Sequence, residues 1–355
     1  MHKKLVLACA ALVLGALAQP TLASNNGPDT GEATAWANLP AGVRYPEGIT
    51  ANPANGDIFV GTFDFGPNAN KLVRFGRNGN VEAVKDFGGQ PLLGLGFAGG
   101  KVYILNFGAS KLQRIRADFN AGTAVEDVAT IPVIGAPAPR TTGNPDGSSD
   151  LITFGSNGMP APNAMVFDGS GTLYISDSFQ GAIFRVASAT TCATPCAVVT
   201  VSHESQLATA GFPPFGANGL ALNAAGNVLY IAVTGDNRVL QMALPGGAIT
   251  PFAESVHGAD GLLFDDGVLW VAANQGDQIV GLDPRGRVIA KVGAFEGIGH
   301  DGAPRGLLFP ASMVISGNHM YVTNLALPLT AQVGDEPEED VTRWNVARIA
   351  NPTRH

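Results

Sequence analysis

One motif returns six times along the chain, and this repetition constrains the fold more than any other feature. Each unit has a short apolar run, a turn rich in Gly, Asn or Asp, and a second apolar run with an aromatic residue near its start. The units begin at Glu47, Leu93, Asn163, Asn218, Asp260 and Ala311. Most successive starts lie roughly 40 to 55 residues apart, a period typical of arrays built from one supersecondary unit.

The repeated unit predicts a meander of short strands. A third apolar run follows the second, as in Ile183–Val186, and no long stretch has helical periodicity. Four-stranded blades of this length predict an all-β fold, a six-bladed β-propeller. A barrel or sandwich would not require one motif to return six times. We expect residues 33–39 to close the ring beside residues 341–349, because an open ring leaves exposed strand edges.

The N-terminus predicts export. Lys3 and Lys4 precede an apolar run from Leu5 to Ala18, which is too short to span a bilayer, and Ala23 ends a small-residue cleavage pattern. Residues 1–23 therefore read as a signal peptide and residues 24–355 as one propeller domain with an inserted loop at about 135–162. We expect a periplasmic or secreted protein, in which Cys192 and Cys196 could form a disulfide.

The composition narrows the range of partners. A formal net charge of −8 argues against nucleic acid or an anionic membrane surface as a partner. A propeller folds alone, so we expect a monomer that acts on a small molecule. Two irregular stretches, residues 135–162 and 295–308, could wall a pocket or could be surface excursions without a role.

The residue that opens each repeat carries the functional signal. Propeller symmetry brings these positions together around the axis, and four of the six bear oxygen donors: Glu47, Asn163, Asn218 and Asp260. Such residues also occur at these positions simply to hydrogen-bond buried backbone. Their shared phase in four repeats favours a metal site, and carboxylate and amide oxygens favour calcium, although another divalent cation is possible.

These residues carry a resemblance. Pro46-Glu47-Gly48, Pro162-Asn163-Ala164, Ala217-Asn218-Gly219 and Ala259-Asp260-Gly261 resemble the calcium-ligand motifs of the senescence marker protein, gluconolactonase and luciferin-regenerating enzyme family, which shares its plan with the paraoxonases. The resemblance covers residues 33–349. It implies a six-bladed propeller that hydrolyses lactones, esters or phosphotriesters at a central calcium.

The chemistry expected from this set is calcium-dependent hydrolysis of a lactone or related ester. The cation would polarise the carbonyl, while Asp260 would serve as base, nucleophile or ligand only. His257, His300 and Asp301 could reach the pocket as proton shuttles or substrate contacts, or be ordinary turn residues. The alternative is a noncatalytic propeller, in which a structural calcium pins the axis and the loops bind a ligand or protein.

Overall fold

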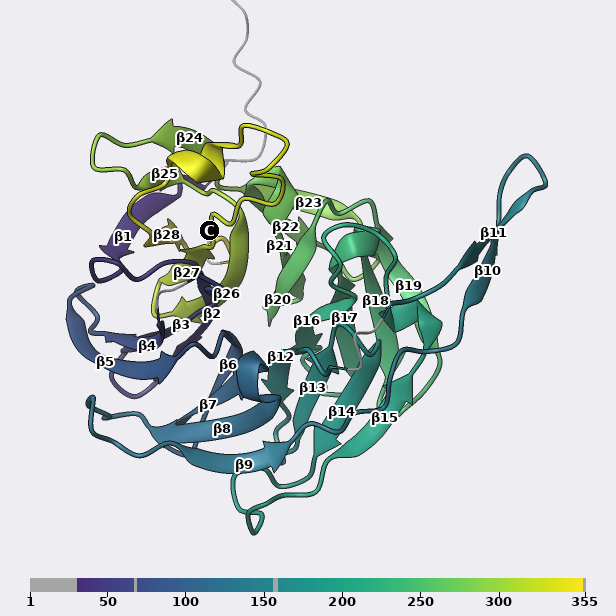
Figure 1. Ribbon diagram of the computed structural model, residues 1–355, viewed down its shortest axis with the longest axis horizontal. Coiled ribbons are helices and arrows are strands. Elements are labelled where there is room, and N and C mark those ends of the chain that lie inside the picture. Colours follow the sequence, from purple (N-terminus) through teal and green to yellow (C-terminus); the bar gives the residue numbers. More distant parts are fainter. Residues whose placement is uncertain (1–30, 67–68, 156–158, 354–355) are drawn as a thin grey trace, which may run out of the picture.

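The computed structural model describes residues 31–66, 69–155 and 159–353, in which six four-stranded antiparallel sheets surround a central axis (Figure 1). The arrangement is a six-bladed β-propeller, so the fold predicted from the repeats is confirmed. The predicted signal peptide lies outside the described residues. Among the described residues, no helix is long and apolar enough to cross a membrane.

In each blade the first strand lies at the axis and the fourth at the rim (Figure 1). Blade 1 contains β2 (Pro46–Ala51), β3 (Ile58–Thr62), β4 (Asn70–Phe75) and β5 (Val81–Gly88); blade 2 contains β6 (Leu92–Ala98), β7 (Lys101–Asn106), β8 (Lys111–Arg116) and β9 (Glu126–Thr130). Blade 3 contains β12 (Pro162–Phe167), β13 (Leu173–Asp177), β14 (Ala182–Val186) and β15 (Val199–His203); blade 4 contains β16 (Ala217–Leu222), β17 (Val228–Val233), β18 (Arg238–Ala243) and β19 (Ile249–Glu254). Blade 5 contains β20 (Ala259–Asp265), β21 (Val268–Ala273), β22 (Gln278–Leu282) and β23 (Val288–Val292).

Blade 6 closes the ring with strands from both ends of the described chain. It contains β26 (Pro310–Ser316), β27 (His319–Asn324), β28 (Asn345–Ala350) and β1 (Thr34–Asn38). β1 pairs antiparallel with β28, from Thr34 opposite Arg348 to Asn38 opposite Asn345. The predicted closure is confirmed, and it ties the N-terminal strand into the last blade, where it covers the edge of β28.

The aromatic residue of each second strand explains why the motif repeats. Each ring packs in the apolar cluster shared with the following blade, so six interfaces are filled by equivalent residues. They are Phe59, Tyr103, Tyr174, Tyr230, Trp270 and Tyr321. Burial of these side chains stabilises each interface between blades.

Small residues follow the axial positions because the inner strands approach each other closely there. A Cβ atom at Gly48 would lie 2.2 Å from the carbonyl oxygen of Leu93, and one at Gly219 would lie 2.0 Å from that of Asp260. Both distances are far below a van der Waals contact. The Glu-Gly, Asn-Gly and Asp-Gly pairs in the sequence therefore record the crowding of six strands around one axis.

Connections between strands depart from the repeat in three places. The segment predicted as an inserted loop contains a hairpin, β10 (Arg140–Gly143) and β11 (Ser149–Ile152), which projects beyond the ring (Figure 1). A second hairpin, β24 (Phe295–Ile298) and β25 (Pro304–Gly306), precedes blade 6. The β27–β28 connection is long and contains the 3-10 turn η5 (Pro337–Asp340).

Shorter features lie at the strand ends. The remaining 3-10 turns are η1 (Phe107–Ala109), η2 (Ser205–Leu207), η3 (Thr234–Asp236) and η4 (Asn274–Gly276). Cys192 and Cys196, in the β14–β15 connection, form a disulfide with their Cα atoms 5.7 Å apart. The sequence indicated that these two cysteines could form a disulfide in an oxidising compartment.

Candidate metal centre in the axial pocket

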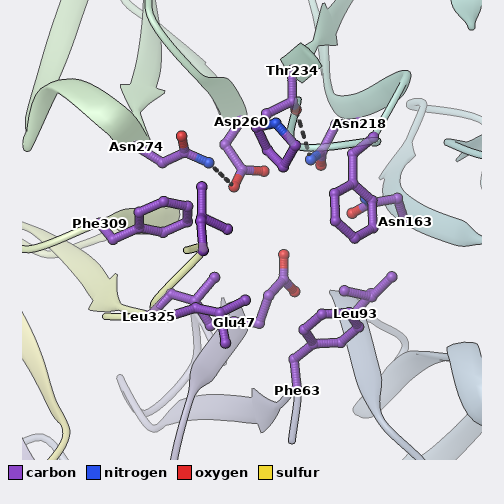
Figure 2. Close-up of a pocket in the computed structure, with 14 residues that line it drawn as sticks. Glu47, Phe63, Leu93, Asn163, Asn218, Thr234, Asp260, Asn274, Phe309 and Leu325 are labelled. Atoms are coloured by element: carbon purple, nitrogen blue, oxygen red, sulfur yellow. Dashed lines mark hydrogen bonds between the residues drawn. The ribbon is translucent and has the colours of Figure 1, made fainter. Parts of the chain in front are cut away.

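The four predicted oxygen donors converge on one pocket at the axis. Glu47, Asn163, Asn218 and Asp260 each occupy the second position of an inner strand, and all four are at most 5% exposed. Figure 2 shows their side chains pointing toward a common space. The cavity has a volume of about 40 Å³, enough for an ion and a few water molecules.

Three of these donors have an oxygen that makes no hydrogen bond in the structure. They are Glu47 Oε2, Asn163 Oδ1 and Asp260 Oδ1, and each is buried. Buried polar atoms normally have a partner, since leaving one unpaired costs free energy. Three orphaned acceptors from three blades that face one cavity therefore indicate a ligand that accepts electron pairs.

Hydroxyl groups of residues that directly follow the second strands orient the two amides. Ser178 Oγ donates to the carbonyl oxygen of Ala217 at 2.7 Å, so its single proton is committed, and it accepts from Asn163 Nδ2 at 2.9 Å. Asn163 must therefore direct its oxygen into the pocket. Thr234 makes the same pair of hydrogen bonds in the next blade.

Thr234 Oγ1 donates to the carbonyl oxygen of Ala259 at 2.7 Å and accepts from Asn218 Nδ2 at 2.9 Å (Figure 2). The orientation of the Asn218 amide is thereby also assigned from its hydrogen bonds. Asn163 Oδ1 is left unpaired beside the cavity, and Asn218 also donates to the Asp260 carboxylate. An unpaired amide oxygen beside two carboxylates fits a cation rather than an anion.

Asn274 plays the corresponding part for Asp260. It follows β21, and its Nδ2 donates to Asp260 Oδ2 at 3.0 Å, which leaves Asp260 Oδ1 directed at the cavity (Figure 2). The Oδ1 of Asn274 is itself buried and without a hydrogen bond. Asn274 therefore positions the carboxylate, while its own oxygen is directed away from Asp260 (Figure 2).

The two carboxylates carry uncompensated charge. No Lys, Arg or His lies among the described residues that line the cavity. Burial raises the pKa of Glu47 well above its usual range, and the nearby charge of Asp260 raises it further. Burial raises the pKa of Asp260 to about 7, although hydrogen bonds from Asn274 and Asn218 act in the opposite direction. Without a cation, burial favours the protonated form of both groups.

The donor chemistry fits a hard divalent cation. All donors are oxygens, two from carboxylates and two from amides, which is the mixture that calcium accepts. Among the described residues, no group of three or more His, Cys, Asp or Glu side chains could hold a metal. The described lining residues therefore do not provide the nitrogen and sulfur ligands typical of many transition-metal sites.

The other half of the pocket is apolar. The apolar lining side chains are Leu93 of β6 and residues of the connections between strands, of which Phe63, Phe309 and Leu325 are labelled in Figure 2. They are Phe63, Leu93, Pro213, Phe215, Phe309, Leu325, Leu327 and Leu329. Leu93 takes the axial position of blade 2, and the other apolar axial residue, Ala311, is buried.

The pocket walls come from segments other than the two irregular stretches considered in the sequence. None of the described residues of 135–162 or 295–308 lines the cavity. Leu327 and Leu329 belong to the long β27–β28 connection. The backbone N–H groups of Leu329 and Thr330 donate to the carboxylate of Glu336, at 2.6 and 2.9 Å, so the acidic run helps to hold this wall.

The predicted substrate contacts lie outside the axial pocket. His300 and Asp301 are exposed in the turn between β24 and β25, where Asp301 lies 3.7 Å from Arg343. His257 is exposed and lines an adjoining hollow together with Asn274, Glu336 and Glu338. His257, which lies close to Asp260 in the sequence, is therefore beside the axial pocket but does not line it.

Sequence reasoning missed the residues that orient the donors. Ser178, Thr234 and Asn274 each directly follow the second strand of their blade. Two of the residues that end second strands cap the turns that follow: Asn106 Oδ1 accepts from the Ala109 backbone at 3.0 Å and Asp177 Oδ1 from that of Gln180 at 3.0 Å. Ser178, Thr234 and Asn274 occupy the same position in their repeats, one residue after the second strand. This shared position was the signal that could have identified them.

Comparison with solved structures supports the fold. No protein-family model matches the sequence, and no curated protein sequence matches it. A luciferin-regenerating enzyme superposes with a TM-score of 0.61 at 15% identity, over 90% of this chain and 95% of the other. A structure described as a calcium-binding protein, regucalcin, from Agrobacterium tumefaciens gives 0.61 at 15% identity, over 90% and 93%.

Two further solved structures have the same architecture. A structure described as a putative gluconolactonase gives a TM-score of 0.57 at 18% identity, over 91% of this chain and 93% of that one. A streptogramin B lyase gives 0.53 at 10% identity, over 90% and 97%. The resemblance stated from the sequence motifs thus extends to the whole fold. At these identities, activity must be argued from the site.

Proposed function

We propose that this protein is a calcium-dependent hydrolase of a lactone or related ester. The observation that carries the proposal is the set of three buried, unpartnered oxygens on Glu47, Asn163 and Asp260 that face one cavity. Asn218 completes the set. Solved propellers described as regucalcin and as a gluconolactonase share the architecture and support the same direction.

The residues present divide the work. Glu47 and Asp260 supply the negative charge that holds a divalent cation, and the two amides supply neutral oxygens with fixed orientation. When bound, the cation supplies Lewis-acid polarisation of a substrate carbonyl. Asp260, held by Asn274 through one oxygen, presents the other toward the cavity, where it can take a proton from an attacking water.

The catalytic reading is favoured over the noncatalytic one by the space beside the donors. A structural ion needs a closed set of ligands, whereas here an apolar cavity adjoins the oxygens, with Leu93 as the axial residue of blade 2. A small molecule can therefore reach the donor set from one side. The noncatalytic propeller remains the outcome expected if calcium binds and no substrate turns over.

Hydrolysis of a panel of aryl acetates and lactones tests the proposal. The chelator-treated protein should be inactive and should recover with calcium. Asp260→Asn should lower kcat by about 100-fold or more, the usual scale for losing a general base. Asp266→Asn, in an exposed turn of the same blade, is the matched control. Calcium binding without any turnover would instead support the noncatalytic propeller.

We further propose that the protein is exported and acts as a monomer in the periplasm or outside the cell. The disulfide between Cys192 and Cys196 supports export, because disulfides persist in oxidising compartments. Expression of the full chain should release a mature protein that begins near Ser24. N-terminal sequencing of the extracytoplasmic fraction and its mass by light scattering check both statements.

A further inference from the structure

The polar groups of the axial pocket leave little for a polyhydroxylated substrate to bind. Of the lining side chains, Glu47, Asn163, Asn218 and Asp260 are the proposed ion ligands. The Thr234 hydroxyl donates its one proton to the Ala259 carbonyl and accepts from Asn218. Asn274 Nδ2 is bound to Asp260, and its Oδ1 packs against Gly258. A sugar lactone would bring several hydroxyls to a site with almost no free partners.

The apolar side of the pocket continues into a row of aromatic rings, here called the phenylalanine cluster: Phe63, Phe65, Phe107, Phe179 and Phe215. Phe63 and Phe215 line the cavity with centroids 6.2 Å apart, and Phe65 and Phe107 lie 4.7 and 5.7 Å from Phe63. Phe179 joins Phe107 and Phe215, at 6.0 and 5.7 Å. The cluster is one connected surface.

The cluster leads from the buried donors to solvent. Phe63 and Phe107 are nearly fully buried, whereas Phe65 is 66% exposed beside them. A large aromatic side chain left open at the end of a buried apolar wall is the kind of surface that binds an apolar ligand. Figure 2 shows Phe63 and Leu93 across the cavity from Asp260 and Asn274.

We propose, on the basis of the hydrolase function proposed above, that the substrate is a lactone or ester with an apolar alkyl or aryl group. Its carbonyl lies at the oxygen donors. Its apolar group lies against Phe63, Phe215 and Leu327 and extends toward Phe65. A polyhydroxylated sugar lactone is the substrate class that this pocket disfavours.

A lactone series tests this proposal with calcium-loaded protein. The series is one five-membered lactone ring with alkyl chains of increasing length, together with a sugar lactone. We expect kcat/KM to rise about two- to fourfold per added methylene until the wall ends, as expected for burial of each group. Turnover of the sugar lactone that exceeds turnover of the alkyl lactones would overturn the substrate class while leaving the hydrolase function standing.

Two variants locate the effect. Phe65→Ser should lower kcat/KM for the longest chain about 5- to 10-fold and change the unsubstituted ring less than twofold. Leu151→Ser, on the β10–β11 hairpin and 69% exposed, is the control and should change neither. An equal loss on both substrates in Phe65→Ser would contradict a role in binding the chain.

A binding measurement separates this proposal from the hydrolase function. The corresponding alkyl lactams keep the ring and chain but resist hydrolysis. Calorimetry should show affinity that rises with chain length and a negative heat-capacity change, the mark of apolar burial. If no lactone turns over, yet lactams bind in this way, the hydrolase function fails and the apolar site stands. Chain-independent lactam binding would overturn the apolar site.

Discussion

At the scale of single residues, the site depends on side chains that fix the donors. Ser178, Thr234 and Asn274 each use a hydrogen bond to orient the axial residue of their own blade. Partners of this kind determine which atom faces a metal, and their loss typically weakens binding by about 10- to 100-fold. The axial residues alone would be free to turn an NH₂ group inward.

Thr234→Val tests this ordering at nearly constant volume. The valine can neither accept from Asn218 Nδ2 nor donate to the Ala259 carbonyl, so the amide loses its fixed orientation. We expect calcium affinity to fall about 10- to 100-fold by calorimetry. Thr250→Val, at an exposed position of β19, should leave it unchanged. Equal affinities in the two variants would show that Thr234 does not orient a ligand.

The raised pKa values of the two carboxylates predict how the metal-free protein responds to pH. A carboxyl group whose pKa is raised in the folded state stabilises that state below its unfolded pKa, near 4, and this contribution is lost as pH rises through the folded pKa, about 7 for Asp260. The chelator-treated protein should therefore melt at lower temperature at pH 7.5 than at pH 5.

Calcium and a charge-neutral variant provide the controls for that pH dependence. Calcium binds the deprotonated carboxylates, so it should raise the melting temperature more at pH 7.5 than at pH 5. Asp260→Asn should flatten the pH dependence of the metal-free protein. A wild-type profile that matches the variant's would contradict a buried, proton-holding pair.

At the scale of elements, the inner strands lie close together because small residues stand where neighbouring strands meet. Gly219 lies where a Cβ atom would come within 2.0 Å of the Asp260 carbonyl oxygen, so the spacing of β16 and β20 depends on a missing methyl group. The same spacing sets the distance between Asn218 and Asp260. Sequence patterns alone showed small residues at these positions, but only the packed ring shows what they approach.

Gly219→Ala should destabilise the protein by about 1–3 kcal/mol, the usual scale for overpacking. Its calcium affinity should fall as well, because β16 and β20 must move apart. Gly143→Ala, in β10 with no atom near its added methyl group, should change neither. Urea denaturation of both variants checks the first statement. A neutral Gly219→Ala would mean that the strands can separate without strain.

The limits of sequence reasoning also appear at this scale. Glu47, Asn163, Asn218 and Asp260 could be found because a repeat gives equivalent residues equivalent places. Leu327 and Phe215 could not, because they lie in connections that differ in length from blade to blade and share no phase. His300 and Asp301 were expected near the pocket because they lie in the irregular stretch 295–308, but the β24–β25 hairpin carries them to an exposed turn.

At the scale of the whole molecule, closure of the ring joins the two ends of the described chain. β1 covers the edge of β28, and the Thr323 hydroxyl of blade 6 donates to the Glu47 carbonyl oxygen of blade 1 at 2.8 Å. The backbone of Glu47 is thus bound to blade 6 across the closure. The aromatic residues of the six second strands indicated in the sequence that the blade repeats. The repeat and its closure bring distant residues to one axis.

Removal of β1 should therefore affect the site as well as stability. A chain that begins at residue 31 should melt like the full mature protein. A chain that begins at residue 39 exposes the edge of β28 and should aggregate or lose calcium binding. Size-exclusion chromatography and calcium titration of the two chains check this. A monomeric, calcium-binding protein without β1 would show that the ring does not need its N-terminal strand.

The central claim is that one cation sits among the four axial oxygens, and anomalous diffraction tests it most directly. Crystals of the mature protein grown with a lanthanide in place of calcium should show one strong peak at the axis. It should lie within roughly 2.3–2.6 Å of Glu47, Asn163, Asn218 and Asp260 oxygens, the calcium range. A cavity without a peak, with these four side chains unchanged, would contradict the account.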